Sequence, residues 1–121
     1  MPWELDSDRP IYDQIVDRLK HEIVSGFYPP GSRLPSVRDL AAQASVNPNT
    51  MQKAFTELER TGLIVTRRTS GRTVTEDTAL IEQVRSELAE LQISQFLTRM
   101  QHLGYQKDDS IRLLLAKKEE I

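Results

Sequence analysis

Cysteine is absent from all 121 residues of the chain. Its absence excludes a disulfide framework, a catalytic thiolate and zinc held by cysteine, and it is typical of proteins in a reducing cytosol. Long apolar runs are absent as well, since no stretch approaches the roughly 18–20 apolar residues of a membrane span. The opening residues, MPWELDSD, lack the character of a signal peptide. We therefore expect a cytoplasmic protein without a membrane segment.

Groups suited to enzyme chemistry are also missing. The sequence has no nucleophile–base pair, no cluster of metal ligands and no glycine-rich loop that would cradle a phosphate. The two histidines, His21 and His102, are isolated in the sequence and have no converging acidic residues. We therefore expect no catalytic residue, no metal site and no cofactor, and we do not expect an enzyme.

The charge of the chain is unevenly distributed. The formal net charge of -2 taken alone argues against a nucleic-acid partner. Residues 33–72, however, hold seven basic and three acidic side chains, a balance of +4, whereas residues 76–121 hold six basic and nine acidic, a balance of -3. A local basic patch matters more for phosphate contacts than the average does.

Two helices are predicted in the first part of the chain. Apolar residues recur at helical spacing through residues 10–28. Pro10 suits the first turn of this helix, and Gly26 suits its C-terminal cap. A turn-rich connection, YPPGSRLP, leads to a second helix that we expect to begin at Ser36, with Asp39 completing a pair similar to a capping box.

A third helix is predicted after a tight connection. Asn47 is a good N-cap and Pro48 then occupies the first helical position, where proline is favoured. Gly62 ends the helix. At about 100° per residue, one arc faces the core and holds Met51, Ala54, Phe55 and Leu58. The opposite arc carries the polar side chains Asn49, Gln52, Lys53, Thr56 and Arg60.

A β-hairpin is predicted next. Residues 63–68 and 72–75 are rich in strand-forming side chains and flank a loop at residues 69–71 that contains glycine. We expect three basic side chains to cluster at the tip of this hairpin: Arg67, Arg68 and Arg72.

The last third of the chain is predicted to form a long helix over residues 77–103 and a short helix capped by Asp108 or Asp109. The apolar stripe of these helices is too extensive for the small preceding domain to cover. We expect a second copy of the chain to bury it, through Ile81, Val84, Leu88, Leu91, Phe96, Met100 and Leu114. In the alternative, the two helices fold back on their own domain and the protein is a monomer.

The order helix, helix, tight turn, helix and hairpin is that of a winged helix-turn-helix. We therefore predict a mainly α fold with a small β-hairpin (α+β). Residues 1–76 form the winged helix-turn-helix DNA-binding domain, and residues 77–121 form a two-helix C-terminal dimerisation region.

Several motifs carry a family resemblance. The run GSRLPSVRDLA, the start VNPNT of the third helix and the step LERTGLIV into the hairpin resemble the DNA-binding domain of GntR-superfamily bacterial transcription regulators. The leading residues RPIYDQIVDRLKHEIVSG and the form VNPNT are similar to the YtrA-like branch, which has a short two-helix C-terminal region.

DNA contacts are expected from two sources. The residue pattern predicts that Lys53 and the other outward-facing side chains of the third helix contact base edges. It also predicts that Arg67, Arg68 and Arg72 contact the DNA backbone or the minor groove. The resemblance implies contacts from Arg38, Asn47, Pro48, Asn49, Thr50, Gln52, Ser70 and Gly71. The chain departs from many relatives in having no arginine at Pro48 or Gln52, and in carrying Ser70-Gly71-Arg72 where wings of the family often read Gly-x-Gly.

These observations predict a sequence-specific transcription regulator that binds a palindrome-like operator as a homodimer. The resemblance implies a repressor. The alternative is a winged-helix module that binds protein and has no specific affinity for DNA. Whether a small-molecule effector acts on the protein remains open.

Overall fold

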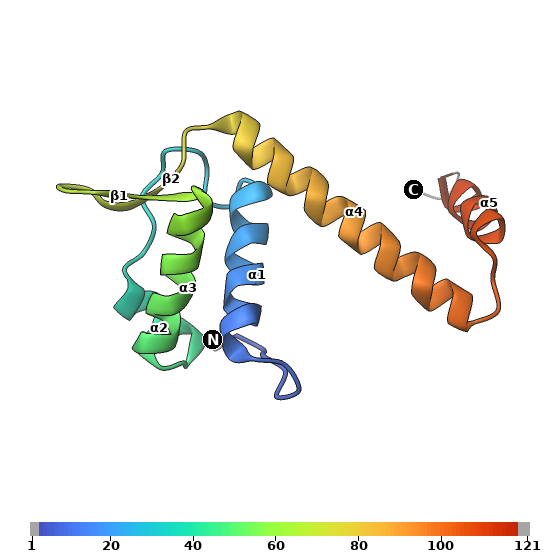
Figure 1. Cartoon of the computed structure of the whole chain (residues 1–121), viewed down its shortest axis with the longest axis horizontal. Helices are drawn as coiled ribbons and strands as arrows, with labels where there is room; N and C mark the ends of the chain where they lie inside the picture. The colour runs from blue at the N-terminus through green and yellow to red at the C-terminus, as the bar shows by residue number, and fades with distance from the viewer. Residues whose placement is uncertain (1–2, 119–121) are drawn as a thin grey trace. The chain divides into compact units, whose positions relative to one another are not determined.

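The computed structural model describes residues 3–118. Its elements are α1 (Ile11–Val24), α2 (Val37–Ala44), α3 (Pro48–Thr61), β1 (Ile64–Arg67), β2 (Gly71–Val74), α4 (Thr78–His102) and α5 (Lys107–Lys118) (Figure 1). This order confirms the predicted mainly helical fold with one small hairpin.

The chain divides into two compact units, of which the first ends at Arg85 and the second begins at Ser86. The boundary between the two units falls inside α4, because Ile81 is buried in the core of the first unit and Val84 packs against that core. The functional division that we expect after residue 76 stays a prediction.

Helix α1 supplies one side of the core of the first unit. Ile15, Leu19 and Ile23 are at most 1% exposed. Pro10 is the N-cap of this helix rather than its first helical residue, which corrects the predicted start by one position. Gly26 follows the C-cap with a φ of 88°, in the left-handed region that glycine enters without steric cost.

Helices α2 and α3 are joined by a tight turn. The hydroxyl of Ser36 caps α2 by accepting a hydrogen bond from the N–H of Asp39 at 3.0 Å, as predicted. Ser45 ends α2 in the left-handed region, with a φ of 58°. Because this turn is so short, α3 crosses α2 directly, and α3 packs on both α1 and α2.

Helix α3 completes the core with Met51, Ala54, Phe55 and Leu58, all fully buried. These are the residues that the helical period placed on its inner arc. Gly62 ends the helix with a φ of 90°, also as predicted.

The hairpin after α3 is the wing. β1 and β2 are antiparallel, with Ile64 opposite Val74 and Arg67 opposite Gly71. The predicted loop is therefore displaced by one residue: it comprises residues 68–70, and Gly71 is the first residue of β2, with a φ of 73°.

The free edge of β2 is also paired. The N–H of Leu34 donates to the carbonyl of Arg72, and the N–H of Val74 donates to the carbonyl of Ser32, both at 2.9 Å. The connection before α2 thus adds a short third segment to the wing and places Arg33 beside it. Pairing on both edges holds β2 in position relative to α2.

The second unit contains the rest of α4 and α5. Helix α5 begins at Lys107, so the expectation that Asp108 or Asp109 caps it was wrong. Asp109 lies in the first turn, where its carboxylate accepts a hydrogen bond from the N–H of Gln106 at 2.8 Å. A carboxylate in the first turn satisfies the same kind of unpaired N–H group as a cap would.

Very little of the second unit is buried. Within residues 86–118, Ser110 is the one buried residue, with an exposed fraction of 1%. Large apolar side chains are exposed instead: Leu91, Ile93, Leu103, Ile111, Leu113, Leu114 and Leu115. No helix in the described part of the chain is long and apolar enough to cross a membrane.

Candidate nucleic-acid interface

The first turn of α3 is fixed by its cap. The side-chain Oδ1 of Asn47 accepts a hydrogen bond from the N–H of Asn49 at 2.7 Å, and the carbonyl of Asn47 accepts from the N–H groups of Thr50 and Met51. Pro48 takes the first helical position, where no N–H partner is needed. The cap leaves the side chain of Asn49 exposed at the very start of the helix.

The outer face of α3 continues with exposed polar side chains. Gln52 donates from Nε2 to the hydroxyl of Thr56 at 3.3 Å, and that hydroxyl donates to the carbonyl of Gln52 at 3.0 Å. The ammonium of Lys53 lies 5.5 Å from the centre of the Tyr12 ring, which is a cation–π distance. This face therefore offers donors and acceptors at several positions, with the opposite face buried in the core.

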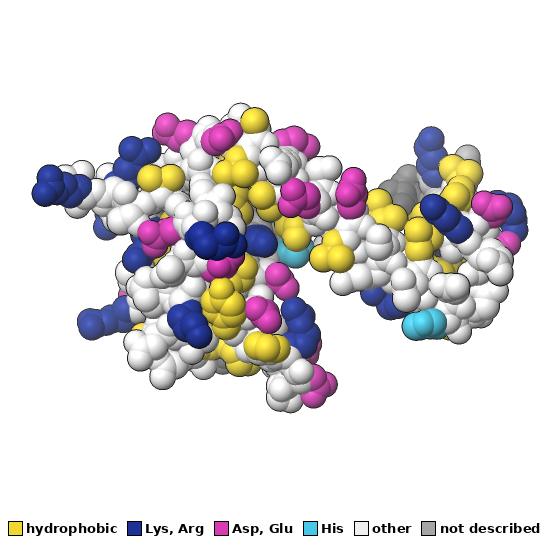
Figure 2. Space-filling view, in the orientation of Figure 1, with side chains coloured by type: hydrophobic (Ala, Val, Ile, Leu, Met, Phe, Trp, Pro, Cys, Tyr) yellow, Lys and Arg dark blue, Asp and Glu magenta, His cyan; other side chains and the backbone are white. Residues whose placement is uncertain are grey.

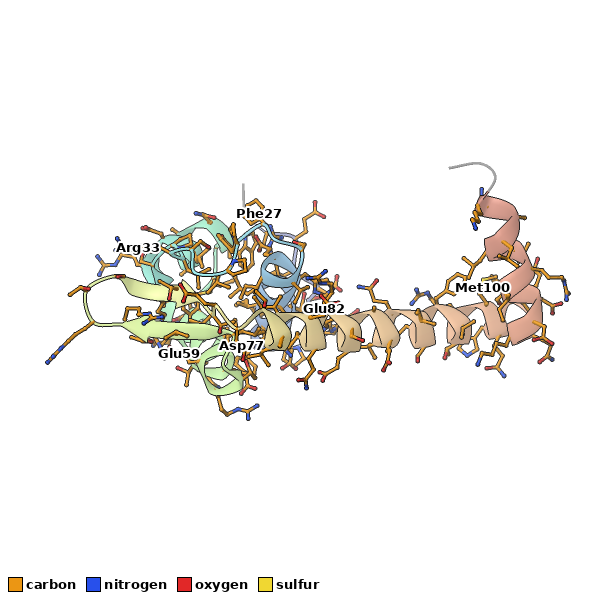
Figure 3. The ribbon with its side chains drawn as sticks, turned by 90° about the horizontal axis from the view of Figure 1, so that it is seen from above. Phe27, Arg33, Glu59, Asp77, Glu82 and Met100 are labelled. Atoms are coloured by element: carbon orange, nitrogen blue, oxygen red, sulfur yellow. The ribbon has the colours of Figure 1, made fainter. Side chains whose placement is uncertain are left out.

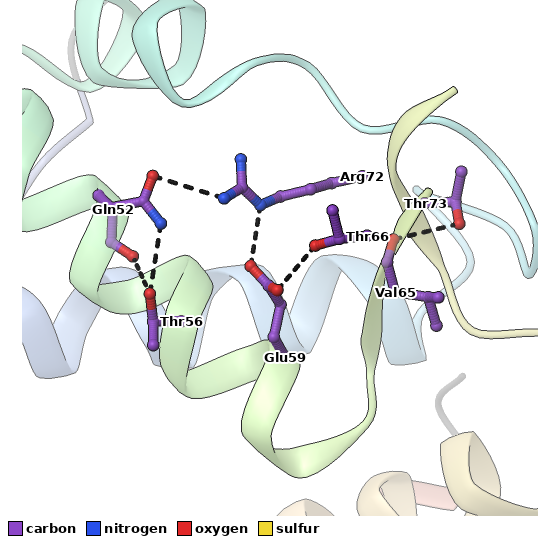
Figure 4. Close-up of polar contacts among 7 residues, drawn as sticks. All are labelled: Gln52, Thr56, Glu59, Val65, Thr66, Arg72 and Thr73. Carbon is purple, nitrogen blue, oxygen red and sulfur yellow. Dashed lines mark hydrogen bonds and ion pairs between the residues drawn. The ribbon is translucent and has the colours of Figure 1, made fainter. Parts of the chain in front are cut away.

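The wing is attached to α3 through Glu59. The carboxylate of Glu59 accepts from the hydroxyl of Thr66 on β1 at 2.7 Å and pairs with Nε of Arg72 on β2 at 2.9 Å (Figure 4). Nη2 of Arg72 lies 3.5 Å from Oε1 of Gln52, and its guanidinium carbon lies 5.3 Å from the centre of the Phe55 ring. One side chain on α3 thus holds both strands.

This arrangement corrects the expected cluster of three arginines. Arg67 and Arg68 are exposed at the end of the wing, but Arg72 turns back toward α3 and its side chain is only 28% exposed. The alternation of side chains along a strand explains the difference, because Arg72 lies on the face of β2 that is turned to α3.

The pKa of Glu59 reflects these contacts. Partial burial alone would raise the pKa of this carboxyl, because burial disfavours the charged form. The hydrogen bonds from Thr66 and Arg72, together with the positive charge of Arg72, outweigh burial and hold the pKa below its ordinary value. Glu59 is therefore a carboxylate at neutral pH, and its charge offsets that of Arg72.

A groove lies between the wing and the start of α2. Its lining includes Arg33, Ser36 and Gly71. In the view of Figure 3, Arg33 and Glu59 lie on opposite sides of the hairpin.

Neither Arg33 nor Glu59 was predicted from the sequence to be a site residue. The signal for Arg33 was its basic side chain in the connection before α2, whereas the role of Glu59 depends on contacts across 7 and 13 residues of sequence.

The structure brings the predicted DNA-contact residues together in the first unit. Figure 2 shows basic side chains at the tip of the wing and over the neighbouring helices. Arg38 is exposed on α2, Thr50 is half-buried, and Arg72 is the residue that is directed inward. The remaining predicted residues are exposed at the start of α3 or on the wing: Asn47, Pro48, Asn49, Gln52, Lys53, Arg67, Arg68, Ser70 and Gly71.

A capped third helix with an exposed polar face, a tight turn before it and a basic wing after it define a winged helix-turn-helix protein that binds DNA. The family described as "Bacterial regulatory proteins, gntR family" matches residues 11–74. The chain belongs to this family and is a DNA-binding transcriptional regulator. The family is not enzymatic, which confirms the expectation that the chain is not an enzyme.

Individual relatives agree with this assignment. The HTH-type transcriptional repressor YtrA of Bacillus subtilis (strain 168) is 40% identical over 100 residues, which is 81% of this chain and 76% of that protein. This likeness supports the YtrA-like resemblance seen in the motifs.

Solved structures are also similar. A GntR family transcriptional regulator from Listeria monocytogenes has a TM-score of 0.83 at 41% identity, covering 93% of this chain and 98% of that one. The DNA-binding domain of AraR, solved in complex with the operator ORX1, has a TM-score of 0.53 at 25% identity, covering 62% of this chain and 92% of that one.

Proposed function

We propose that the protein represses transcription as a homodimer that binds a palindrome-like operator, with α3 in the major groove and the wing alongside. The observation that carries this proposal is the outer face of α3. Asn49, Gln52, Lys53 and Thr56 are exposed in succession along it, while the inner face is fully buried. A helix with one polar face and a fixed inner face suits the major groove of B-DNA.

Base contacts are proposed for two amide side chains. Asn49 and Gln52 each carry one donor group and one acceptor, the pattern that matches the N6 and N7 edge of adenine. Lys53 lies beside them and suits guanine or a phosphate. The hydroxyl of Thr50 suits a phosphate as well.

Backbone contacts are proposed for the elements around α3. Arg38 on α2 and Arg67 and Arg68 on the wing are exposed. Ser70, the last residue of the wing loop, and Gly71, the first residue of β2, are proposed to lie close to the duplex. These contacts position α3 in the groove without reading sequence.

The homodimer is proposed from the exposed apolar side chains of the second unit. Its face includes the exposed Leu91 and Leu114 together with three half-buried side chains, Leu88, Phe96 and Met100. Leu91 and Leu114 are 53% and 54% exposed, and burial of apolar area stabilises an interface by about 25 cal/mol per Å². Ile81 and Val84 are left out of this face, since Ile81 is buried in the core of its own unit and Val84 packs against that core. A two-fold dimer presents two copies of α3 to two half-sites.

Repression and a cytoplasmic location complete the proposal. The similarity to a protein named as a transcriptional repressor supports repression. A bacterial regulator meets its operator in the cytoplasm, and no described helix is suited to crossing a membrane.

Selection of bound DNA from a random pool tests this function. We expect the protein to enrich a palindrome-like motif, and its affinity for that motif to fall steeply with salt because phosphate contacts release counterions. Asn49→Ala is expected to lose the preference at one position in each half-site and to retain the rest. A chain that enriches no motif and shows no dependence on salt would instead favour the protein-binding module.

A further inference from the structure

Gln52 is held by a network that reaches it from the wing. Its Oε1 lies 3.5 Å from Nη2 of Arg72, and its Nε2 lies 3.3 Å from the hydroxyl of Thr56. Arg72 is held in turn by Glu59, at 2.9 Å from Nε. Figure 4 shows the resulting chain of contacts running from Glu59 through Arg72 to Gln52 and on to Thr56.

We propose that Arg72 and Glu59 are positioning residues that orient the carboxamide of Gln52 and thereby set the base preference at one operator position. This inference rests on the proposed function. It assigns to Arg72 a role within the protein instead of the phosphate contact that its charge suggested.

The geometry of Arg72 suits a positioning role. Its guanidinium lies over the ring of Phe55, which is fully buried, and its Nε is engaged by Glu59. The planar fork of arginine offers donors in fixed relative directions, so one nitrogen is directed to Glu59 while another is directed to Gln52. The ion pair with Glu59 and the contact with the Phe55 ring hold the guanidinium against α3.

The orientation of Gln52 matters because the two ends of a carboxamide differ. Arg72 has only donors, so it selects the oxygen of Gln52, and the hydroxyl of Thr56 is left to accept from the nitrogen. Among the described residues, these contacts leave one N–H and one oxygen lone pair of the Gln52 carboxamide without a partner. A bidentate contact with adenine needs one donor and one acceptor. The network therefore presents Gln52 in a single orientation before DNA arrives.

Glu59 couples this orientation to the wing as a whole. Its two carboxylate oxygens engage Thr66 and Arg72, which are direct partners across the hairpin. Both strands are consequently fixed relative to α3 by the residue that holds Arg72. The wing thus contributes to sequence reading through Gln52, in addition to any backbone contact made by its tip.

The central variant is Arg72→Lys, which keeps the charge and removes the fork. Gln52→Ala first identifies the operator position that Gln52 reads, because the preference for one base is lost there. A bidentate contact corresponds to a preference of about 5- to 150-fold. We expect Arg72→Lys to lower the preference at that same position by about threefold or more, with other positions changing by less than about twofold. Glu59→Gln is expected to act at the same position in the same direction.

Salt dependence separates a positioning role from a phosphate contact. If Arg72 orients Gln52, Arg72→Gln leaves the slope of log affinity against log salt unchanged. If Arg72 binds a phosphate, Arg72→Gln lowers that slope by about 0.9 per half-site and weakens all operator sequences alike. Arg68→Gln is the matched control, since Arg68 is exposed on the wing and is expected to lower the slope without changing any base preference.

The outcomes are distinguishable. A wild-type protein that enriches no motif overturns the proposed function. A motif that is enriched, together with an unchanged preference at the Gln52 position in Arg72→Lys and Glu59→Gln, overturns only the inference. The inference also fails if Gln52→Ala changes no position. In the double variant Gln52→Ala/Arg72→Lys, the effect of Arg72→Lys on that position should vanish, and a persistent effect counts against the network.

Discussion

The side chain of Asn47 accepts a hydrogen bond from the backbone N–H of Asn49, across 2.7 Å. The two asparagines therefore have separate tasks, although they are only two residues apart. Asn47 uses its side chain to start α3, whereas Asn49 contributes its backbone to the cap and keeps its side chain exposed. Variants of Asn47 should consequently change the stability of the fold, whereas variants of Asn49 should change DNA recognition.

Asn47→Ala is expected to lower the free energy of unfolding by about 1 kcal/mol, the usual value of a lost helix cap. Urea unfolding followed by circular dichroism measures this change. Asn47→Asp retains a capping oxygen and should stay close to the wild type. Asn49→Ala is the control for the separation of tasks, because it leaves the cap intact. A large loss of stability in that variant would contradict the assignment.

Gly62→Ala tests the end of α3. Alanine in the left-handed region costs about 1 kcal/mol, and the new Cβ would also lie 3.2 Å from Cδ2 of Leu80. Gly26 provides a matched control, since it has a similar φ of 88° and no atom within 4 Å of the same Cβ. Thermal unfolding should show a larger loss of stability for Gly62→Ala than for Gly26→Ala. Equal losses would mean that the side chain of Leu80 moves aside without destabilising the fold.

Glu59 predicts a dependence of stability on pH. The pKa of this carboxyl is lower in the folded protein than its ordinary value of 4.5, which applies in the unfolded chain. At pH below that value the unfolded chain takes up the proton first, so the contribution of Glu59 is present above pH 4.5 and is lost as the pH falls through the lowered pKa.

The difference in unfolding free energy between wild type and Glu59→Gln should therefore be largest near neutral pH and shrink in acid. Urea unfolding of both proteins from about pH 7 to about pH 3 measures it. Glu4→Gln, which changes an exposed carboxyl near the N-terminus, controls for the change in net charge. A difference that stays constant over the whole range would show that the carboxylate contacts do not stabilise the fold.

Leu91→Arg tests the proposed homodimer. A charged side chain in an apolar interface is costly because it loses its hydration, so we expect monomers at concentrations where the wild type is dimeric. Sedimentation velocity gives the mass of each species. Gln101→Arg is the control: Gln101 is also exposed on α4, and at about 100° per residue it lies about 80° or more around the helix from every α4 residue of the proposed face. Equal behaviour of the two variants would place the interface elsewhere.

Local signals in the sequence were sufficient for most helix ends. Ser36, Asn47 and Gly62 each act through neighbours a few residues away, and each lies where its chemistry predicted. The wing loop was displaced by one residue because strand register depends on pairing with a second strand. Helix α5 began early because a carboxylate in the first turn can serve the N–H groups that we assigned to a cap.

The sequence by itself determined the family, most of the helix boundaries and the outward face of α3, since periodicity and capping act over one or two turns. Only the tertiary structure decided where Arg72 is directed. Its sequence neighbourhood indicates an exposed basic tip, yet Glu59 on α3 and the ring of Phe55 draw it inward. Contacts between residues 13 or more positions apart arise only when the wing packs on α3, and no local pattern encodes them.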